Sequence, residues 1–297
     1  VGFPGGRLQA LTVAWDARPA SSGGQRWFSL NPGLPTTGTD ELRWTGPEYN
    51  WNFMCADCHS TGTRKGYDAV TGGYHTTVAE LSVGCEACHG PGSAHVKWAA
   101  APQWLRRFFW RDDGLPAQLT ERRGIQWVLD PGDSIAHRSP VRTTEREVEV
   151  CAQCHARRIH IADGYTAGAP LLDFYIPDLI TADLYYPDCE QLDEVYEYGS
   201  FLQSKMYRAG VTCSDCHEPH SNQLRRLGNQ LCTQCHRAST YDTRAHSFHA
   251  PGTTGAQCVA CHMPTTTYMG IQARRDHGMS VPRPDLSVAM GVPNACN

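Results

Sequence analysis

The stretch Cys213-Ser-Asp-Cys216-His217-Glu-Pro-His220, followed by Cys232-Thr-Gln-Cys235-His236, decides how this chain is organised. Each Cys-x-x-Cys-His unit has the pattern by which a c-type haem is attached covalently. The two thiols bond to the porphyrin vinyl groups, and the adjacent histidine binds the iron as its proximal ligand. His220 stands only three residues past a motif histidine and cannot reach the far side of the same iron. We therefore expect His220 to bind a neighbouring haem.

The spacing of these four cysteines would also suit a tetrahedral zinc site. Repetition argues against zinc, because the unit occurs six times and histidine follows the second cysteine every time, although only 14 of the 297 residues are His. Neither a zinc site nor a disulfide needs histidine at that position. The predicted attachment pairs are Cys55 and Cys58, Cys85 and Cys88, Cys151 and Cys154, Cys213 and Cys216, Cys232 and Cys235, and Cys258 and Cys261; the predicted proximal ligands are His59, His89, His155, His217, His236 and His262.

The number of haems also limits the kind of fold. Six haems leave about fifty residues for each, so porphyrin faces must supply much of the buried apolar surface. We expect a mainly α chain with sparse secondary structure, wrapped around a closely packed haem array, with 28 Gly and 19 Pro supplying turns. We divide it into residues 1–50, a β-hairpin and loop region with strand-like runs at 8–15 and 25–30, and residues 51–297, the cytochrome domain.

Three helices are expected outside the haem motifs. One runs from Ser93 through the aromatic stretch that ends at Trp110. The capping-box pattern Thr144-x-x-Glu147 predicts a short helix that leads into Cys151. Ser200-x-x-Gln203 predicts another, which ends near Gly210.

The use of the cysteines indicates where the protein is located. Twelve of the fourteen cysteines belong to haem units, which leaves Cys189 and Cys296 and excludes a disulfide scaffold. Covalent haem attachment takes place outside the bacterial cytoplasm, so we expect a periplasmic or extracellular protein. No apolar run is long enough for a transmembrane helix. The chain begins at Val1 without a visible signal peptide, and we interpret this start as a processed end or as one preceded by further sequence.

The charge balance argues against nucleic acid as a partner. The formal net charge is −4, and twelve haem propionates with six ferric cores would bring it to about −10. Arg outnumbers Lys by 23 to 3. The planar guanidinium pairs well with carboxylates, so some of the five Arg-Arg pairs are candidate propionate clamps, although solvent-exposed surface is the simpler interpretation of any one pair.

Three segments resemble one family. They are Glu86-Ala-Cys88-His89-Gly-Pro-Gly, the segment 193–220, and the segment that begins Arg274-Arg-Asp-His277. Together they resemble the multihaem c-type cytochromes with doubled CxxCH motifs, which are often fused to tetratricopeptide repeats. In that family Pro-Asn-Ala-Cys continues into a further haem motif. The resemblance therefore implies that this chain is the central part of a longer protein, with a seventh haem unit beginning at Cys296.

The distal ligands are predicted by subtraction. Eight histidines remain after the six proximal ones, and imidazole at the sixth position gives a low-spin iron suited to electron transfer. His137 lies in a Pro-rich loop, which suggests a surface histidine, and Met206 or Met269 could serve instead of histidine, although methionine is more often a packing residue. The distal candidates are His95, His220, His246, His249 and His277, followed by His160 and His75.

Two classes of function fit these features. A carrier would pass electrons along closely packed six-coordinate haems to other redox proteins, or to further copies of itself in an extracellular filament or other larger assembly. An enzyme would instead keep one haem five-coordinate and act there on a nitrogen or sulfur oxyanion. The eight spare histidines are enough to close all six irons, and no Cys-x-x-Cys-Lys unit is present. The sequence therefore favours an electron carrier, with no catalytic residue assigned.

Overall fold

The computed structural model describes residues 1–33, 37–40 and 42–295. Cys296, the expected start of a seventh haem unit, lies outside the described residues. The chain forms two compact units. Unit 1 comprises residues 1–118, 160–176 and 267–273, and unit 2 comprises 119–159, 177–266 and 274–297. Residues 1–50 therefore share a unit with the first two CxxCH motifs, and the boundary expected at residue 50 stays a prediction.

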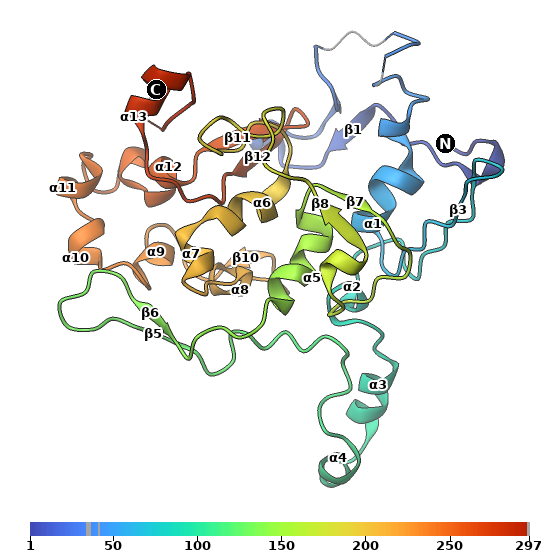
Figure 1. Cartoon of the computed structure of the whole chain (residues 1–297), viewed down its shortest axis with the longest axis horizontal. Coiled ribbons are helices and arrows are strands. Elements are labelled where there is room, and N and C mark those ends of the chain that lie inside the picture. Colours follow the sequence, from blue (N-terminus) through green and yellow to red (C-terminus); the bar gives the residue numbers. More distant parts are fainter. Residues whose placement is uncertain (34–36, 41, 296–297) are drawn as a thin grey trace. The chain divides into compact units, whose positions relative to one another are not determined.

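Short helices and two-stranded hairpins, joined by long irregular segments, make up both units (Figure 1). The expectation of a mainly helical chain with sparse secondary structure is confirmed. The α-helices of the described residues are α1 Ala56–His59, α2 Cys85–His89, α3 Ser93–Ala100, α4 Gln103–Phe109, α5 Arg146–His155, α6 Tyr196–Gln203, α7 Lys205–Arg208, α8 Cys213–Cys216, α9 Gln230–Thr233, α10 Ala238–Tyr241, α11 Arg244–Ser247, α12 Cys258–His262 and α13 Pro284–Met290. A π-helical turn, Trp51–Cys55, precedes α1, and 3₁₀ turns occur at Pro4–Gly6, Ala20–Ser22, Pro47–Tyr49, Leu171–Asp173 and Thr254–Ala256.

Every sheet among the described residues has two strands. In the first hairpin β1 pairs antiparallel with β2, so that Val13 is opposite Ser29 and Asp16 is opposite Arg26. The two strands overlap the runs 8–15 and 25–30 that the sequence marked, although β1 is shorter than its run and ends one residue later. The strands are β1 Val13–Asp16 with β2 Arg26–Ser29, β3 Tyr67–Asp68 with β4 Gly73–Tyr74, β5 Gln126–Val128 with β6 His137–Ser139, β7 Arg158–His160 with β8 Tyr175–Pro177, β9 His217–Glu218 with β10 Gln223–Leu224, and β11 Thr265–Tyr268 with β12 Gln272–Arg275.

The single helix expected from Ser93 to Trp110 is wrong. The chain forms two helices there, α3 and α4, separated by Ala101 and Pro102. Proline has no backbone N–H, and its ring disfavours helical geometry at the residue before it. Ala101 accordingly has extended dihedral angles, φ −73° and ψ 143°.

The helix expected before Cys151 is confirmed as α5, but its cap differs from the prediction. The Thr144 hydroxyl donates a hydrogen bond of 2.7 Å to Glu121 Oε1, and the Glu147 backbone N–H donates one of 3.0 Å to the same oxygen. A carboxylate far away in sequence therefore satisfies the helix start and also carries the charge that a helix N-terminus favours.

The helix expected to start at Ser200 begins earlier. Ser200 lies inside α6, and the capping serine is Ser204, whose hydroxyl accepts a hydrogen bond of 3.0 Å from the Tyr207 N–H at the start of α7. The expected end near Gly210 is confirmed, because α7 stops at Arg208 and Gly210 adopts a left-handed φ of 91°.

A buried cluster in unit 2 holds α5 and α6 together. Val148, Phe201 and Val211 are its buried members, 3 %, 7 % and 8 % exposed. Met206 packs against them, as expected of a packing methionine. Because α5 carries one CxxCH unit and Val211 precedes another, this cluster fixes the helices that present two haem motifs.

None of the described helices is both long and apolar enough to cross a bilayer.

Candidate haem-binding sites

Helical geometry places both thiols of a CxxCH unit on one side of the chain. In α2 and α12 the first cysteine begins the helix and the histidine ends it. Side chains three residues apart on a helix are neighbours, so Cys258 and Cys261 project from the same face, with His262 beside Cys261. None of the thirteen cysteines of the described residues forms a disulfide. The motif cysteines thus keep the chemistry that thioether formation requires.

The alternative of a zinc site would need several His, Cys, Asp or Glu side chains around one point. Within the described residues no group of three or more His, Cys, Asp or Glu side chains is arranged to hold a bare metal ion. A structural zinc site needs four such ligands at about 2.0–2.3 Å from the metal.

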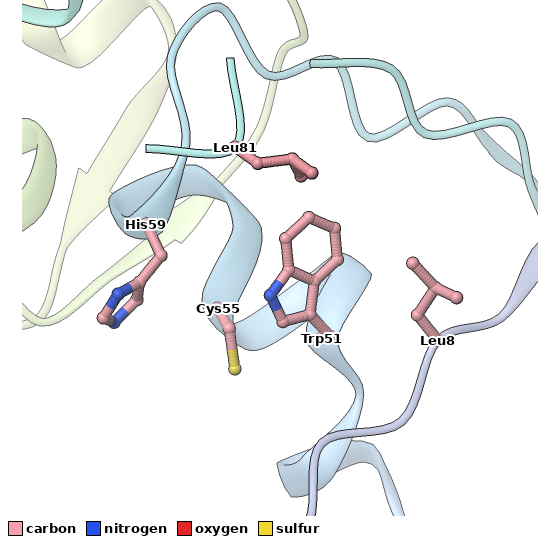
Figure 2. A pocket seen from close by; sticks show the side chains of 5 residues that line it. All are labelled: Leu8, Trp51, Cys55, His59 and Leu81. Carbon is pink, nitrogen blue, oxygen red and sulfur yellow. The ribbon is translucent and has the colours of Figure 1, made fainter. Parts of the chain in front are cut away.

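In unit 1 the first CxxCH motif opens into a pocket of about 600 Å³. Figure 2 shows its lining: Trp51, Cys55 and His59 come from one continuous helical stretch, and Leu8 and Leu81 lie on either side of the indole. A sulfur and an imidazole therefore share an apolar pocket. One thiol and the imidazole of the motif thus line the pocket together with apolar side chains, a surface that suits a porphyrin face.

In unit 2 the ring centroids of His217 and His277 are separated by the distance expected for two ligands of one metal. Their centroids are 6.3 Å apart and their planes differ by 27°. Two metal–imidazole bonds of about 2 Å, with about 1.1 Å from each nitrogen to its ring centre, place trans imidazoles about 6 Å apart. The Nδ1 of His277 lies 2.9 Å from the Arg275 carbonyl oxygen, which can only accept a hydrogen bond. His277 Nε2 is therefore the nitrogen available to iron.

His246 and His262 repeat this arrangement. Their centroids are 6.1 Å apart, and the ring planes are within 14° of parallel. His262 Nδ1 donates to the Ser280 carbonyl oxygen at 2.8 Å, which again leaves Nε2 for the metal. His217 and His262 are proximal candidates, so each pair joins a motif histidine to a histidine that the subtraction selected.

A carboxylate orients the motif histidine of α5. Glu197 Oε2 accepts a hydrogen bond of 2.7 Å from His155 Nδ1. Burial pushes the pKa of Glu197 upward, but the bond from His155 and the charges of His155, His277 and Arg274 outweigh it, and the pKa lies below its ordinary value. An ionised carboxylate on Nδ1 fixes the tautomer and makes Nε2 a stronger ligand.

Partial desolvation shifts the pKa of two proximal candidates. Burial, followed by the neighbouring His277 and His155, lowers the pKa of His217. Burial, followed by His262, lowers the pKa of His236. Both rings therefore favour the neutral form, which is the form that binds a metal.

The cysteines of successive motifs in unit 2 lie next to each other. The Cys213 thiol is hydrogen-bonded to Cys151, and this bond, with burial, raises the pKa of Cys151. Cys232 and Cys258 form a second hydrogen-bonded pair, which raises the pKa of Cys232. The first cysteines of adjacent motifs are thus paired.

A buried carboxylate, Glu147, connects the first of these cysteine pairs to its surroundings. It accepts hydrogen bonds from the Ser214 N–H at 2.6 Å and the Ser214 hydroxyl at 2.9 Å. Glu147 is 5 % exposed, and burial raises its pKa despite these bonds. It ties α5 to α8 at the point where the two helices bring their cysteines together.

Two distal candidates of unit 1 are held firmly. His95, on α3, stacks on Trp98 at 5.3 Å, and its Nδ1 donates to the Asp113 carbonyl oxygen at 2.8 Å, so Nε2 is available to a metal. The His160 side chain is 5 % exposed, with Asp57 3.8 Å from Nδ1 and Asp163 3.8 Å from Nε2. His95 therefore has one nitrogen occupied by a carbonyl oxygen, whereas His160 has a carboxylate near each of its two nitrogens.

The other candidates are more exposed. His75 follows β4 and is exposed. The His220 side chain is 81 % exposed, with Nδ1 3.2 Å from Glu218. His249 is exposed beside Gly255, where an added Cβ would come within 2.6 Å of the imidazole. His137, expected at the surface, is 56 % exposed and 3.5 Å from Asp130. Met269, in the turn between β11 and β12, is 41 % exposed. The ligand roles of these side chains stay predictions.

Apolar side chains around the motifs fit a porphyrin face. Leu81 and Leu227 are each 79 % exposed, shortly before Cys85 and Cys232, and Phe248, between two distal candidates, is 84 % exposed. Exposed apolar groups of this size mark surfaces that bind something apolar. Together with the paired imidazoles, they show that the residues present fit haem.

Sequence reasoning missed several residues of these sites. Glu197 lies in a segment quoted for the family resemblance, yet no role was assigned to it. The capping box Thr212-x-x-Asp215, which starts α8 at Cys213, was also missed although its pattern is plain. The carbonyl acceptors of His95, His262 and His277 could not be found from sequence, because a backbone oxygen has no side-chain signature.

Two families match parts of the chain. The model of the doubled CXXCH motif matches residues 205–240, and that of cytochrome c554 and c-prime matches residues 39–90. Four of the six CxxCH units lie within these ranges. Among solved structures, the outer cell wall cytochrome OcwA matches with a TM-score of 0.60 and 20 % identity over 99 % of this chain. The resemblance to the multihaem c-type cytochromes is confirmed.

The similarity to OcwA covers only part of that protein. This chain spans 66 % of the length of the OcwA chain, slightly less than two thirds. At 20 % identity the likeness shows the fold, which is that of a cytochrome, and the matched motifs support haem c binding through CXXCH. None of these matches shows tetratricopeptide repeats. A search of curated proteins found no match.

Proposed function

We propose that the chain is an electron carrier that binds six haems covalently and passes electrons between them outside the cytoplasm. The observation that carries the proposal is the pairing of imidazoles. His217 with His277 and His262 with His246 stand at the separation of two ligands on one iron. A carrier gains from such closed coordination, since the ligands need not change when the iron changes its oxidation state.

The two pairs support a proposal for the axial ligands of two haems. The haem attached at Cys213 and Cys216 takes His217 as proximal and His277 as distal ligand. The haem attached at Cys258 and Cys261 takes His262 and His246. Bis-histidine ligation favours low-spin iron, and the protein tunes each potential through burial and nearby charge. Glu197, on His155, is one such charge.

The cysteine contacts support a path within unit 2. A thioether joins each sulfur directly to a porphyrin edge, so contact between Cys151 and Cys213 brings two haem edges together. Contact between Cys232 and Cys258 likewise brings together the edges of the two haems attached at those cysteines. Burial, followed by the charges of Asp215 and Cys216, raises the pKa of Cys235, and this nearness of Cys216 to Cys235 would connect the two cysteine pairs. The order of transfer in unit 2 is therefore the order of the motifs along the chain.

The proposed location is extracytoplasmic. The OcwA structure is titled an outer cell wall cytochrome, and the described residues contain no helix able to span a membrane. Electron donors and acceptors would be other redox proteins or further copies of the chain, in a filament or another assembly.

Electron paramagnetic resonance of the oxidised holoprotein tests this function. We expect only low-spin ferric signals, unchanged by nitrite, hydroxylamine or sulfite, and no carbon monoxide binding after reduction. Electron transfer alone needs no open position, whereas chemistry on a substrate requires the iron to bind the reacting atom. A high-spin signal of one haem per chain that shifts with one of these anions would contradict the carrier and support an oxidoreductase acting on that anion.

A further inference from the structure

An aromatic ring in unit 2 contacts histidines that belong to two different haems. The Tyr241 ring, at the end of α10, lies edge-on to His236, with centroids 5.5 Å apart and planes at 87°. It also lies edge-on to His246, with centroids 5.3 Å apart and planes at 88°. His246 is in turn paired with His262 at 6.1 Å.

We propose that Tyr241 is a positioning residue that fixes the axial imidazoles of two neighbouring haems at once. On the ligation proposed above, these are the proximal ligand of the haem at Cys232 and Cys235 and the distal ligand of the haem at Cys258 and Cys261. The inference therefore rests on the proposed function and adds to it the residue that couples the two sites.

The tyrosine is itself fixed at its far end. Its hydroxyl lies 3.0 Å from the Ser134 hydroxyl. The adjoining segment is fixed as well, because the Arg237 backbone N–H donates to the Ser134 carbonyl oxygen at 2.8 Å and the Ala136 N–H donates to the Cys235 carbonyl oxygen at 2.8 Å. These hydrogen bonds hold the Tyr241 ring and the haem motif at Cys232 and Cys235 against the same 134–136 segment.

The contact restricts the one motion that a bound imidazole retains, which is rotation about the iron–nitrogen bond. Edge-to-face contacts between 4.5 and about 7 Å are attractive and directional, so a ring at nearly 90° to both imidazoles favours one rotation angle for each. The angle of an axial imidazole plane sets the splitting of the iron d orbitals and hence the g-values of a low-spin haem. Rotation of one imidazole also changes the face that Tyr241 presents to the other. The two haems should therefore respond together.

The variant Tyr241→Leu tests this in the holoprotein, because leucine keeps apolar volume without a flat ring. We expect the g-values of two low-spin haems per chain to shift while the other four keep theirs. Tyr241→Phe retains the ring and should restore both signals to nearly their original positions. Circular dichroism and the covalent haem content of each variant establish that it is folded and loaded.

Three outcomes would overturn the inference. These are a folded Leu variant with six unchanged signals, a shift of one haem only, and a Phe variant as altered as the Leu variant. If the Leu variant does not fold, Ser134→Ala in its place should shift the same two signals to a smaller extent, and unchanged signals would again be decisive. His246→Ala separates this result from the ligation proposal, because it should make one haem high-spin whether or not Tyr241 orients the ring.

Discussion

Replacing His277 by alanine should convert one haem per chain from low-spin to high-spin while all six haems stay attached. The affected haem is the one at Cys213 and Cys216, because the His277 ring centroid lies 6.3 Å from that of His217 and the contact of His277 Nδ1 with the Arg275 carbonyl leaves Nε2 for the iron. Loss of the distal imidazole leaves a five-coordinate iron or one with water at the sixth position, and both states are high-spin at the ferric level. The potential of this haem should rise, since a donor to the ferric state has been removed.

The measurement is quantitative electron paramagnetic resonance with a count of covalent haem. His137→Ala is the matched control, because that ring is 56 % exposed and its Nδ1 faces Asp130 at 3.5 Å. The control should retain every low-spin signal. If the His277 variant keeps the full low-spin count, the His217–His277 pair does not ligate a common iron.

Replacing Phe201 by alanine should destabilise unit 2 by about 3–5 kcal/mol, the usual cost of removing a large buried aromatic side chain. Phe201 is 7 % exposed, lies in one cluster with Val148 and Val211, and contacts Tyr207 edge-on at 5.5 Å. Removal would leave a cavity between α5 and α6 at the place where these helices position His155 and Glu197.

Denaturant unfolding followed by far-ultraviolet circular dichroism measures the change. Phe108→Ala is the control of identical chemistry, since Phe108 is 76 % exposed on α4 and its loss should cost less than about 0.5 kcal/mol. Equal losses of stability in the two variants would show that the cluster of Val148, Phe201 and Val211 does not hold α5 against α6.

The sequence was sufficient to predict features that depend on residues close together in the chain. A CxxCH unit specifies its cysteines and its histidine without reference to the rest of the chain, and a hairpin such as β1–β2 follows from short β-rich runs separated by Pro and Gly. The mainly helical character and the family resemblance were also accessible, since both depend on residues that are close in sequence.

Features that depend on distant residues were not accessible from the sequence. Thr144 resembled an N-cap, but Glu121, more than twenty residues earlier, caps α5. Subtraction produced a list of distal histidines, but it could not say which proximal histidine each one pairs with. His277 lies sixty residues after His217, and a turn separates His246 from His262, so their spacing in sequence does not predict either contact. Tyr241 had no motif at all. Its role follows only from where α10, α11 and the segment after α9 place the rings of Tyr241, His246 and His236.

The covalent haem content of chain 1–297 tests the central claim most directly. Purified protein is denatured, free haem is extracted, and the bound haem is counted by its reduced pyridine spectrum and by intact mass. We predict six haems per chain, carried by the cysteine pairs that begin at Cys55, Cys85, Cys151, Cys213, Cys232 and Cys258. Fewer than six covalent haems in fully matured protein, or stoichiometric zinc in their place, would contradict the account.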